Sequence, residues 1–376
     1  MPILSSPIIV GTVDFCGMTL ASLIFPLMKP IFNRIDAETA HRWTIAMLKS
    51  QGNARRPPSS NLAIDCWGLS FPNPLGVAAG FDKNADVPDT LLGLGFGFVE
   101  VGTVTPRPQA GNPRPRLFRL AEDEAVINRM GFNNLGSGIV RRHLEARRDK
   151  RGMVGVSIGA NKNSADWISD YVQGVRTFAD MASYLAINIS SPNTTGLRGL
   201  QSRAALEDLI AAVKEARATR PTPLLVKIAP DLSDREIEDI AELCSADSID
   251  GIIVSNTTVS RPPLRSPLAR ERGGLSGKPL FDMSTRALAR LRLLVDRRVV
   301  LVGTGGISDA ATAWAKIAAG ATLIQLHTAL VYRGPALIDE ILDGLASRLA
   351  EGGFASIAQA SGCRAREIAH HGSAGT

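Results

Sequence analysis

Eight short runs rich in Val, Ile and Leu constrain the fold of this chain more than any other feature of its sequence. The runs lie at 74–80, 97–102, 153–158, 184–188, 223–228, 251–256, 299–303 and 322–326, with helical patterns between them at 204–218, 234–244, 284–295 and 309–319. Nearly continuous apolar strands that alternate with helices are typical of parallel sheets covered on both faces. We therefore predict a (β/α)8 TIM barrel, whose usual size of about 250 residues fits the chain after Asn61. A doubly wound sheet is the alternative, which eight evenly spaced units disfavour.

The composition argues against several classes of protein. The net charge of +6 comes from 42 Lys and Arg against 36 Asp and Glu. These basic residues are spread along the chain and form no dense run with aromatic residues, which argues against nucleic acid as a partner. The four cysteines lie far apart and the five histidines lack a zinc-like spacing, so we expect reduced thiols and no metal.

The N-terminal segment is apolar but interrupted. Its first 28 residues contain no Lys or Arg, which argues against a secretory signal and against an Arg-rich transit peptide. Pro7, Asp14, Pro26 and Pro30 leave no uninterrupted span of about 20 apolar residues, so we expect it not to cross a membrane. The basic residues that begin at Lys29 suit an amphipathic element lying on a membrane surface. A helix packed on its own domain is the alternative.

The pattern predicts three parts of the chain. Residues 1–56 form a small helical, membrane-associating segment, 57–354 form the barrel, and 355–376 form a C-terminal tail that we expect to be disordered from Gly372. A Pro- and Arg-rich insertion at 105–134 interrupts the alternation of strands and helices. We expect this insertion to form a β-hairpin on the face that carries the site.

Polar side chains gather where the predicted strands end, and barrels of this type carry their chemistry there. Lys83 follows the first run, Thr103 the second, and Asn256 with Thr257 the sixth. The stretch 188–193, Asn-Ile-Ser-Ser-Pro-Asn, sets two carboxamides around a serine on a loop stiffened by proline. Carboxamides offer donors and acceptors without charge, which suits a planar, amide-rich ligand. An ordinary connecting turn is the alternative.

Two further features indicate an anionic ligand. Lys227 lies inside the apolar run 223–228, where a charge is costly unless a partner meets it. A bound anion or electron-rich ring is favoured over an internal ion pair, because the lysine lies near the site rim. The Gly-rich stretch 303–308 predicts a phosphate cradle with Ser308 as the N-cap of the next helix, and 273–277 either closes over the same phosphate or is a flexible turn. Together these features suit FMN across the barrel mouth, and no GxGxxG motif indicates a nicotinamide site.

As a set, these motifs resemble those of the dihydroorotate dehydrogenases, specifically the membrane-associated, quinone-using class 2. They follow the order of that family and extend from about residue 31 to about residue 354. The matching stretches are 79–83 (Ala-Gly-Phe-Asp-Lys), 101–106 (Val-Gly-Thr-Val-Thr-Pro), 127–134 (Ile-Asn-Arg-Met-Gly-Phe-Asn-Asn), 188–193, 226–232 (Val-Lys-Ile-Ala-Pro-Asp-Leu), 256–258 (Asn-Thr-Thr), 273–277 and 305–307 (Gly-Gly-Ile).

The resemblance implies oxidation of (S)-dihydroorotate to orotate in de novo pyrimidine synthesis, with FMN as bound carrier and a membrane quinone as acceptor. Ser191 would remove the C5 proton while hydride leaves C6 for the flavin. Class 2 uses serine where the soluble class uses cysteine. A lone hydroxyl is a poor base, so Ser191 would depend on a water-excluded site and a proton relay. We expect a monomer bound peripherally to the cytoplasmic side of a bacterial inner membrane.

The resemblance also assigns roles to individual residues. Substrate contacts fall on Lys83, Asn128, Arg129, Met130, Gly131, Phe132, Asn188, Asn193, Asn256 and Thr257. FMN contacts fall on Ala79, Gly80, Phe81, Asp82, Lys83, Thr103, Asn188, Lys227, Ser255, Gly277, Gly306, His327 and Thr328. Arg119 matches a position near the quinone, and the segment 1–56 resembles the helical pair that gives the quinone access.

Three features depart from the family pattern. Ser157 stands where the family has an asparagine that touches FMN, and His327 replaces a tyrosine near the flavin and the quinone. Residues 1–17 have no clear counterpart, and Met18 could be the natural start. Two alternatives remain. Ser191 and the apolar N-terminus argue against a soluble enzyme using fumarate or NAD, and the retained lysines and asparagines argue against a flavin-binding barrel without turnover.

Overall fold

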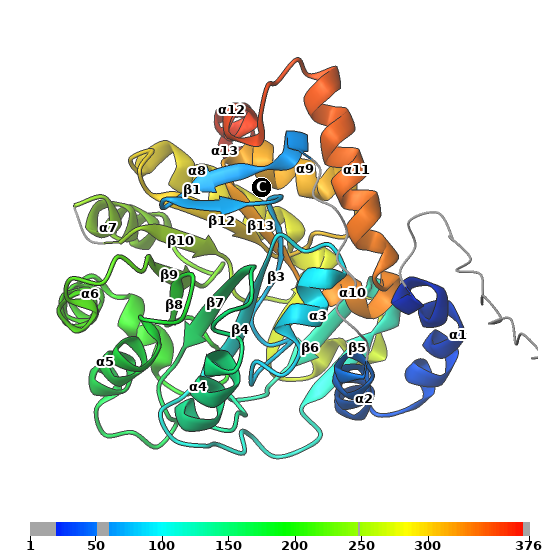
Figure 1. The fold of residues 1–376 in the computed structure, drawn as a ribbon, viewed down its shortest axis with the longest axis horizontal. Helices are drawn as coiled ribbons and strands as arrows, with labels where there is room; N and C mark the ends of the chain where they lie inside the picture. The colour runs from blue at the N-terminus through cyan, green and yellow to red at the C-terminus, as the bar shows by residue number, and fades with distance from the viewer. Residues whose placement is uncertain (1–19, 51–59, 247–248, 371–376) are drawn as a thin grey trace, which may run out of the picture.

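A closed barrel of eight parallel strands forms the centre of the protein in a computed structural model, which describes residues 20–50, 60–246 and 249–370. The strands are β3 (Leu75–Val77), β4 (Phe98–Val104), β7 (Met153–Ile158), β8 (Leu185–Asn188), β9 (Leu224–Ile228), β10 (Gly251–Val254), β12 (Val300–Thr304) and β13 (Leu323–Leu326). They pair in chain order, and β13 closes the barrel on β3 (Figure 1). Each predicted run overlaps one strand, so the (β/α)8 prediction is confirmed.

The barrel interior is filled by large side chains that face glycines on neighbouring strands. A Cβ at Gly76 would lie 2.4 Å from the Phe98 ring, and one at Gly155 would lie 2.2 Å from the Tyr184 ring. Every residue of β4 and of β9 is buried, as expected for strands covered on both faces. The centre is therefore a packed core, and ligands must bind at its ends.

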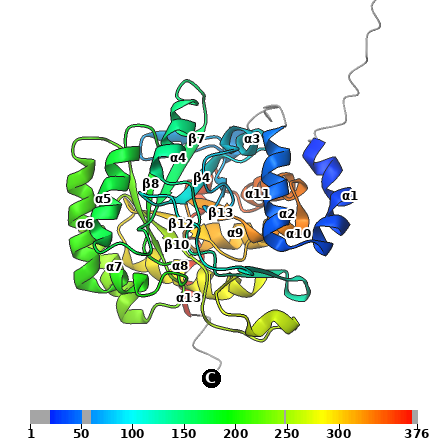
Figure 2. The same ribbon diagram turned by 90° about the horizontal axis from the view of Figure 1, so that it is seen from below.

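Helices surround the barrel on the outside, as Figures 1 and 2 show. They are α3 (Pro88–Gly93), α4 (Ser137–Glu145), α5 (Trp167–Phe178), α6 (Arg203–Arg217), α7 (Asp234–Ser245), α8 (Phe281–Leu294), α9 (Ala310–Ala319), α10 (Thr328–Arg333) and α11 (Ala336–Glu351). Each of the longer helices turns an apolar stripe to the strands. In α6, for example, Leu206, Leu209, Ile210 and Val213 are buried at helical spacing.

An antiparallel hairpin closes the end of the barrel where the strands begin. It consists of β1 (Ile64–Cys66) and β2 (Leu69–Phe71), joined through Trp67 and Gly68. Phe71 packs edge-on against Phe98 with ring centroids 5.6 Å apart. The Trp67 indole donates a hydrogen bond of 2.9 Å to the carbonyl of Asp250, just before β10. Only the opposite end, where the strands finish, is left for a site.

The insertion after β4 forms the predicted hairpin, and a later segment extends it. Strands β5 (Leu117–Leu120) and β6 (Ala125–Asn128) are antiparallel, and β11 (Gly274–Gly277) pairs with β6 on the other side. Leu120, Ala125, Ile127 and Leu275 form a small apolar cluster inside this sheet. The stretch 273–277 is therefore an ordered strand, so its interpretation as a flexible turn is wrong.

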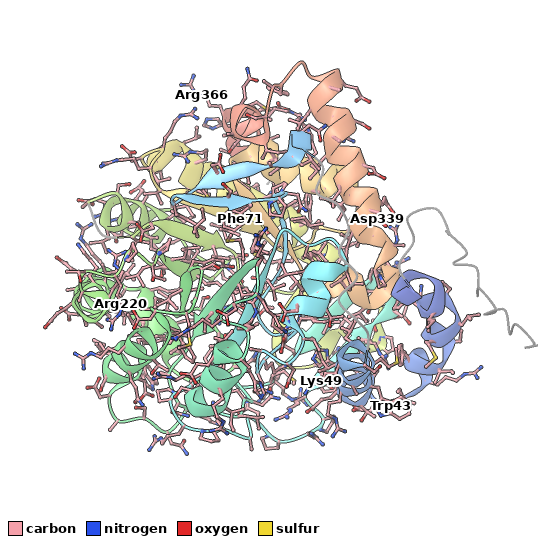
Figure 3. The ribbon with its side chains drawn as sticks, viewed as in Figure 1. Trp43, Lys49, Phe71, Arg220, Asp339 and Arg366 are labelled. Carbon is pink, nitrogen blue, oxygen red and sulfur yellow. The ribbon has the colours of Figure 1, made fainter. Side chains whose placement is uncertain are left out.

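Two N-terminal helices, α1 (Leu20–Arg34) and α2 (Ala37–Lys49), lie on one side of the barrel near α10 (Figure 2). The Glu38 carboxylate fixes α2 through ion pairs of 2.8 Å with Arg116 and 2.9 Å with Arg114. Large apolar side chains nonetheless remain exposed on this pair. Leu27 is 76% exposed and Trp43, at the edge of the molecule in Figure 3, is 48% exposed. None of the helices in the described ranges is long and apolar enough to span a membrane.

The last described residues fold against the barrel. Helices α12 (Ile357–Ala360) and α13 (Ala365–His370) pack on α9 and, for α13, on α8. The backbone N–H of Arg364 donates to the carbonyl of Ala318, in the last turn of α9. The part expected as a tail thus contributes to the outer layer, while the expected disorder from Gly372 and the extension 1–17 lie outside the described residues. The boundaries at 56 and 354 remain a prediction.

Candidate functional site

A deep pocket opens at the ends of the barrel strands. It encloses about 1260 Å³ of empty space, its open mouth included. The predicted site residues that line it are Ala79, Gly80, Lys83, Thr103, Asn128, Met130, Gly131, Phe132, Asn188, Ser191, Asn193, Lys227, Ser255, Asn256, Thr257, Gly277, Gly306, His327 and Thr328. Segments in or after seven of the eight barrel strands, all except β7, therefore meet in one place, which we call the polar cavity.

Carboxamides form a hydrogen-bonded network on the wall of the polar cavity. Asn256 donates from Nδ2 to Asn188 Oδ1 at 3.2 Å, and Asn188 donates from its own Nδ2 to Thr103 Oγ1 at 2.8 Å. Across the cavity, Asn193 Nδ2 donates to Asn128 Oδ1 at 3.1 Å. These bonds fix the orientation of each amide, so the remaining donors and acceptors are directed before a ligand arrives.

Ser191 lies in the same wall, on the loop that follows β8. Its side chain is buried, and its Oγ accepts the backbone N–H of Asn193 at 3.3 Å. No described residue forms an ion pair or side-chain hydrogen bond with this hydroxyl. The arrangement leaves Oγ facing the cavity and shielded from bulk water.

Lys83 supplies a cation at the cavity wall. Its Nζ donates to the Gly80 carbonyl at 2.7 Å. Burial lowers the pKa of Lys83 to about 8, while the carboxylates of Glu38 and Asp82 oppose that shift. The ammonium form still predominates at pH 7, so this group can bind an anionic substituent.

Lys227 also lines the cavity, but it already has an anionic partner in the core. Its Nζ lies 3.4 Å from Glu100 Oε1, and both side chains are buried. Glu100 Oε2 in turn accepts hydrogen bonds from Gln325 Nε2 at 2.7 Å and from the Tyr184 hydroxyl at 3.0 Å. The internal ion pair that was the alternative is therefore present, and contact of Lys227 with a ligand stays a prediction. The ion pair holds the ammonium in place at the cavity floor.

The glycine-rich loop after β12 forms a cradle at one end of the cavity. Gly305 and Gly306 both have positive φ, +103° and +79°, which side chains rarely adopt. Among the described residues no acceptor meets the backbone N–H of Gly306 or Ile307. The N-cap of α9 is Asp309, whose carboxylate accepts from the Thr312 N–H, so the prediction of Ser308 as N-cap is wrong by one residue. Ser308 instead donates its backbone N–H to Thr312 Oγ1.

Three buried polar atoms of the polar cavity lack partners among the described residues. They are Asn133 Oδ1, Thr257 Oγ1 and His327 Nε2. Buried polar atoms in native proteins are nearly always paired, with protein, water or ligand. Unpaired atoms from different strand ends of one cavity, together with the open N–H groups of the cradle, fit a large polar ligand with a phosphate at one end. In the described part of the chain no group of His, Cys, Asp and Glu side chains could hold a metal ion.

A second cavity adjoins the first between α1, α2 and the barrel. It encloses about 1030 Å³ of empty space, and its lining includes Phe25, Phe32, Ala40, Leu48, Leu91, Phe96, Leu330 and Val331. We call it the apolar cavity. His41, Leu117, Val126 and His327 line both cavities. A ligand in one cavity is therefore separated from a ligand in the other by a single layer of side chains.

Arg119 and Lys29 are the two residues with permanently charged side chains that line the apolar cavity. The Arg119 guanidinium donates to the carbonyls of Phe32 and Ile35, at the turn between α1 and α2. This contact attaches the N-terminal helices to β5, over more than 80 residues of sequence. Arg119, which was predicted to lie near the quinone, lines the apolar cavity, and its contact with a quinone stays a prediction.

Aromatic side chains connect the two cavities. The Phe81 ring packs edge-on against His327, with centroids 5.9 Å apart, and against His41, at 5.5 Å. Burial, with smaller effects from Lys83 and Lys227, lowers the pKa of His327 to about 4. Burial also lowers the pKa of His41 well below its usual range. Both imidazoles are thus neutral at pH 7, and each can donate at one nitrogen and accept at the other.

Three residues predicted to contact substrate or FMN lie outside the polar cavity. Phe81 faces the apolar cavity. The Asp82 carboxylate is buried behind its loop, where it accepts the backbone N–H groups of Asp86 and Val87 at 2.8 Å each. Arg129 turns outward to Glu271, at 2.7 Å. Their motifs place the backbone correctly, but a motif does not determine which way each side chain points.

The Ser157 departure has a visible consequence. Its side chain is fully buried and its Oγ shares a hydrogen bond of 2.9 Å with Thr103 Oγ1. Ser157 thus supports the Thr103–Asn188 bond from behind and does not line the cavity itself.

Five lining residues with polar side chains were not predicted from the sequence. They are His41, Asn133, Ser276, Thr304 and Gln325. Asn133 and Ser276 lie inside motifs that were singled out, so their neighbours gave a usable signal. The sequence also contains a signal for Glu100, because a carboxylate inside an apolar run needs a partner just as the ammonium of Lys227 does. The sequence contains no signal for His41, since only tertiary packing brings α2 to the barrel mouth.

Comparisons with known proteins identify the family to which this chain belongs. The family model described as dihydroorotate dehydrogenase matches residues 61–349. The chain belongs to the dihydroorotate dehydrogenase family. A protein of Parvibaculum lavamentivorans named dihydroorotate dehydrogenase (quinone) is 55% identical over 342 residues, which cover 90% of this chain and 98% of that protein. One of Rhodopseudomonas palustris with the same name is 52% identical, over 90% of this chain and 95% of that protein.

Solved structures of the family share the fold. The crystal structure of the Eimeria tenella dihydroorotate dehydrogenase in complex with ferulenol is 39% identical, with a TM-score of 0.84. The match covers 87% of this chain and 95% of that one. The ligand-free form of the same protein gives the same score and identity. The resemblance to the quinone-using dihydroorotate dehydrogenases predicted from the motifs is thereby confirmed.

Proposed function

We propose that this protein oxidises (S)-dihydroorotate to orotate in de novo pyrimidine synthesis, with FMN as bound carrier and a membrane quinone as acceptor. One observation carries the proposal: a polar cavity rich in carboxamides and an apolar cavity share a wall of four residues. A reaction that moves electrons from a polar substrate to a lipid-soluble acceptor needs these two environments side by side. The family membership of the chain supports the same activity.

The carboxamides of the polar cavity hold the substrate in this proposal. Asn128, Asn193 and Asn256 direct amide groups at the imide edge of the pyrimidine ring, and Lys83 binds its carboxylate. The backbone from Met130 to Phe132 closes the cavity over the ring. Because the amides are fixed by their own hydrogen bonds, little freedom is lost when the substrate binds.

Ser191 is the proposed base. Its Oγ takes the proton from C5 of dihydroorotate as the C6–H bond breaks with its electron pair, which leaves the C5–C6 double bond of orotate. A hydroxyl is a weak base, so its own proton must leave at the same time through a relay. Burial of Ser191 and the Asn193 N–H bonded to Oγ keep the group oriented and shielded from bulk water.

The cradle and the cavity floor are the proposed FMN site. The open N–H groups of Gly306 and Ile307, at the start of α9, suit the phosphate, and Lys227 with Thr103 and Ser255 suits the ring system. Bound there, FMN supplies a hydride acceptor for the substrate and a two-electron donor for the quinone. Glu100 keeps Lys227 oriented toward the ring whether or not a ligand is present.

The apolar cavity and the helices around it are the proposed quinone site. Its carbon-rich lining suits an isoprenoid quinone, while Arg119 and His41 offer polar contacts to the quinone oxygens. Residues 1–56 would then provide both quinone access and contact with the cytoplasmic face of the inner membrane, through exposed side chains such as Leu27 and Trp43. We propose that the protein acts as a monomer, because both cavities are lined by one chain.

An absorbance spectrum of the purified protein tests this proposal directly. We expect flavin bands in the visible region, their bleaching when dihydroorotate is added without oxygen, and their return when a ubiquinone analogue follows. Return of the bands with fumarate or NAD, and not with quinone, would support the soluble alternative. Bands that dihydroorotate fails to bleach would indicate a flavin-binding barrel without turnover.

A further inference from the structure

A lysine buried behind the glycine-rich cradle has no role in the chemistry described so far. Lys316, on α9, is 0% exposed. Its Nζ donates to Ser284 Oγ at 2.6 Å and lies 5.4 Å from the centroid of the Phe281 ring. Among the described residues no carboxylate lies within ion-pair distance of this nitrogen, in contrast to Lys227. Lys316 is thus a buried amine without an ion-pair partner in the part of the chain that the structure describes.

Hydrogen bonds connect Lys316 to the cradle through Ser284. The Ser284 hydroxyl accepts from Lys316 and lies within donating distance of the carbonyls of Gly305, at 3.0 Å, and Phe281, at 3.1 Å. The packing is close, since a Cβ on Gly305 would lie 3.0 Å from Ser284 Oγ and one on Gly306 would lie 2.4 Å from Phe281 Cα. A substitution of Lys316 should therefore disturb Gly305 and Gly306 through the side chain of Ser284.

The geometry of the helix explains how a residue far along α9 reaches its first turn. Side chains in a helix point back toward its N-terminus, so the long stem of Lys316 runs toward the loop that precedes Ala310. Gly303 gives the stem room, because a Cβ there would lie 3.2 Å from Lys316 Cβ. The amine thus adds to the positive end of the helix dipole beneath the cradle.

The buried charge of Lys316 indicates that an anion binds nearby. Burial lowers the pKa of Lys316 well below its usual range, with only the charge of Asp282 opposing the shift. A buried ammonium is costly unless an anion offsets it. The cradle of Gly305 and Gly306, which Ser284 connects to Lys316, is a place where an anion can bind, because the backbone N–H groups of Gly306 and Ile307 there have no acceptor among the described residues.

We propose that Lys316 is a positioning residue for the phosphate of the bound flavin: through Ser284 it fixes the Gly305–Gly306 cradle, and its charge attracts the phosphate from below. The inference rests on the FMN site proposed above. It predicts that Lys316 favours FMN over riboflavin, which has the same ring system without the phosphate. A lysine that served packing alone would affect both flavins equally.

The test compares the two flavins in full-length protein freed of its cofactor. Dissociation constants for FMN and for riboflavin are measured by quenching of flavin fluorescence. We expect Lys316→Met, which keeps the length of the side chain, to weaken FMN binding about tenfold, the scale of one partly screened charge interaction, and riboflavin binding less than about twofold. Ser284→Ala should shift the preference in the same direction by a smaller factor.

Stability of the flavin-free protein provides a second measurement. Lys316→Met removes a buried charge that has no carboxylate partner, so the flavin-free variant should unfold at the same temperature as the parent or higher. Ile317→Val, next to it on α9 and fully buried, serves as the packing control. It should lower the unfolding temperature slightly and leave the flavin preference unchanged.

The outcomes separate the two proposals. A parent protein that binds neither FMN nor riboflavin contradicts the FMN site itself. A parent that prefers FMN, with Lys316→Met keeping the full preference, overturns only the role of Lys316. Equal loss of both flavins, or a marked drop in flavin-free stability, also overturns it and indicates a packing role. Should Lys316→Met fail to fold, Lys316→Gln allows the same comparison.

Discussion

The two cavities differ in how they are built, although they share a wall. The polar cavity is lined by strand ends and loops of the barrel, and its side chains are held by hydrogen bonds such as those of Asn188 and Asn256. The apolar cavity is formed by packing α1 and α2 against the outside, and Arg119 and Glu38 supply its main polar attachments. The first is therefore a rigid binding site, whereas the second can adapt to a ligand that has shape but few polar groups.

The largest effect should follow from breaking the chemistry of the polar cavity alone. We expect Ser191→Ala to retain bound flavin and to slow its reduction by dihydroorotate by about 10²–10⁴-fold, the usual contribution of a general base. Stopped-flow bleaching of the flavin without oxygen measures this step. The variant should still pass electrons from chemically reduced flavin to quinone at the parent rate. An undiminished rate of bleaching would show that another group is the base.

A change in the apolar cavity should have the opposite signature. Arg119→Ala removes the bonds to the carbonyls of Phe32 and Ile35, so the N-terminal helices should hold the quinone less well. We expect the KM for a ubiquinone analogue to rise about tenfold, the loss of one hydrogen bond from a charged group, with flavin reduction by dihydroorotate unchanged. Arg129→Ala, outside both cavities, is the matched control. Equal damage to both half-reactions would mean that the two cavities are not independent.

The pH dependence should also separate the cavities. The pKa of Lys83 is lowered to about 8, so its ammonium is present below that pH and is lost as the pH rises through it. The KM for dihydroorotate should therefore rise by up to about tenfold per pH unit above 8, while the KM for quinone stays flat. Steady-state kinetics between pH 7 and pH 10 measure both values. In Lys83→Arg, which stays charged, the rise should disappear, and its persistence would assign the titration to another group.

The smallest effect concerns the outer surface of the apolar cavity. Trp43→Glu places a charge on an exposed site of α2 and should weaken binding to phospholipid vesicles severalfold, with little change in turnover of a water-soluble quinone analogue. Co-sedimentation with vesicles measures the binding. Leu294→Glu, an equally exposed apolar site at the end of α8, is the control and should leave it unchanged. Equal losses in both variants would argue against α2 as the membrane contact.

The same contrast explains how much could be predicted from the sequence. The eight strands and the residues at their ends follow from local patterns, so Ser191, Asn188 and Lys227 were placed correctly in one cavity. Contacts between distant segments leave no such pattern. The Glu100–Lys227 ion pair, the outward turn of Arg129 and the approach of His41 to the barrel mouth all depend on packing across more than 100 residues of sequence, or on side-chain direction. The apolar cavity as a whole likewise depends on contacts between distant segments and could not be predicted from local patterns.

The hairpin of β1 and β2 has a practical consequence for work with this protein. Trp67 and Phe71 plug the barrel on the side where strands begin, so substrate and product must come and go on the other side. The C-terminal helix α13 lies on the plugged side too, because the N–H of Arg364 just before it donates to the carbonyl of Ala318, in the last turn of α9, which leads to the start of β13. An affinity handle or a surface tether attached after α13 should thus leave ligand traffic and lipid docking unobstructed.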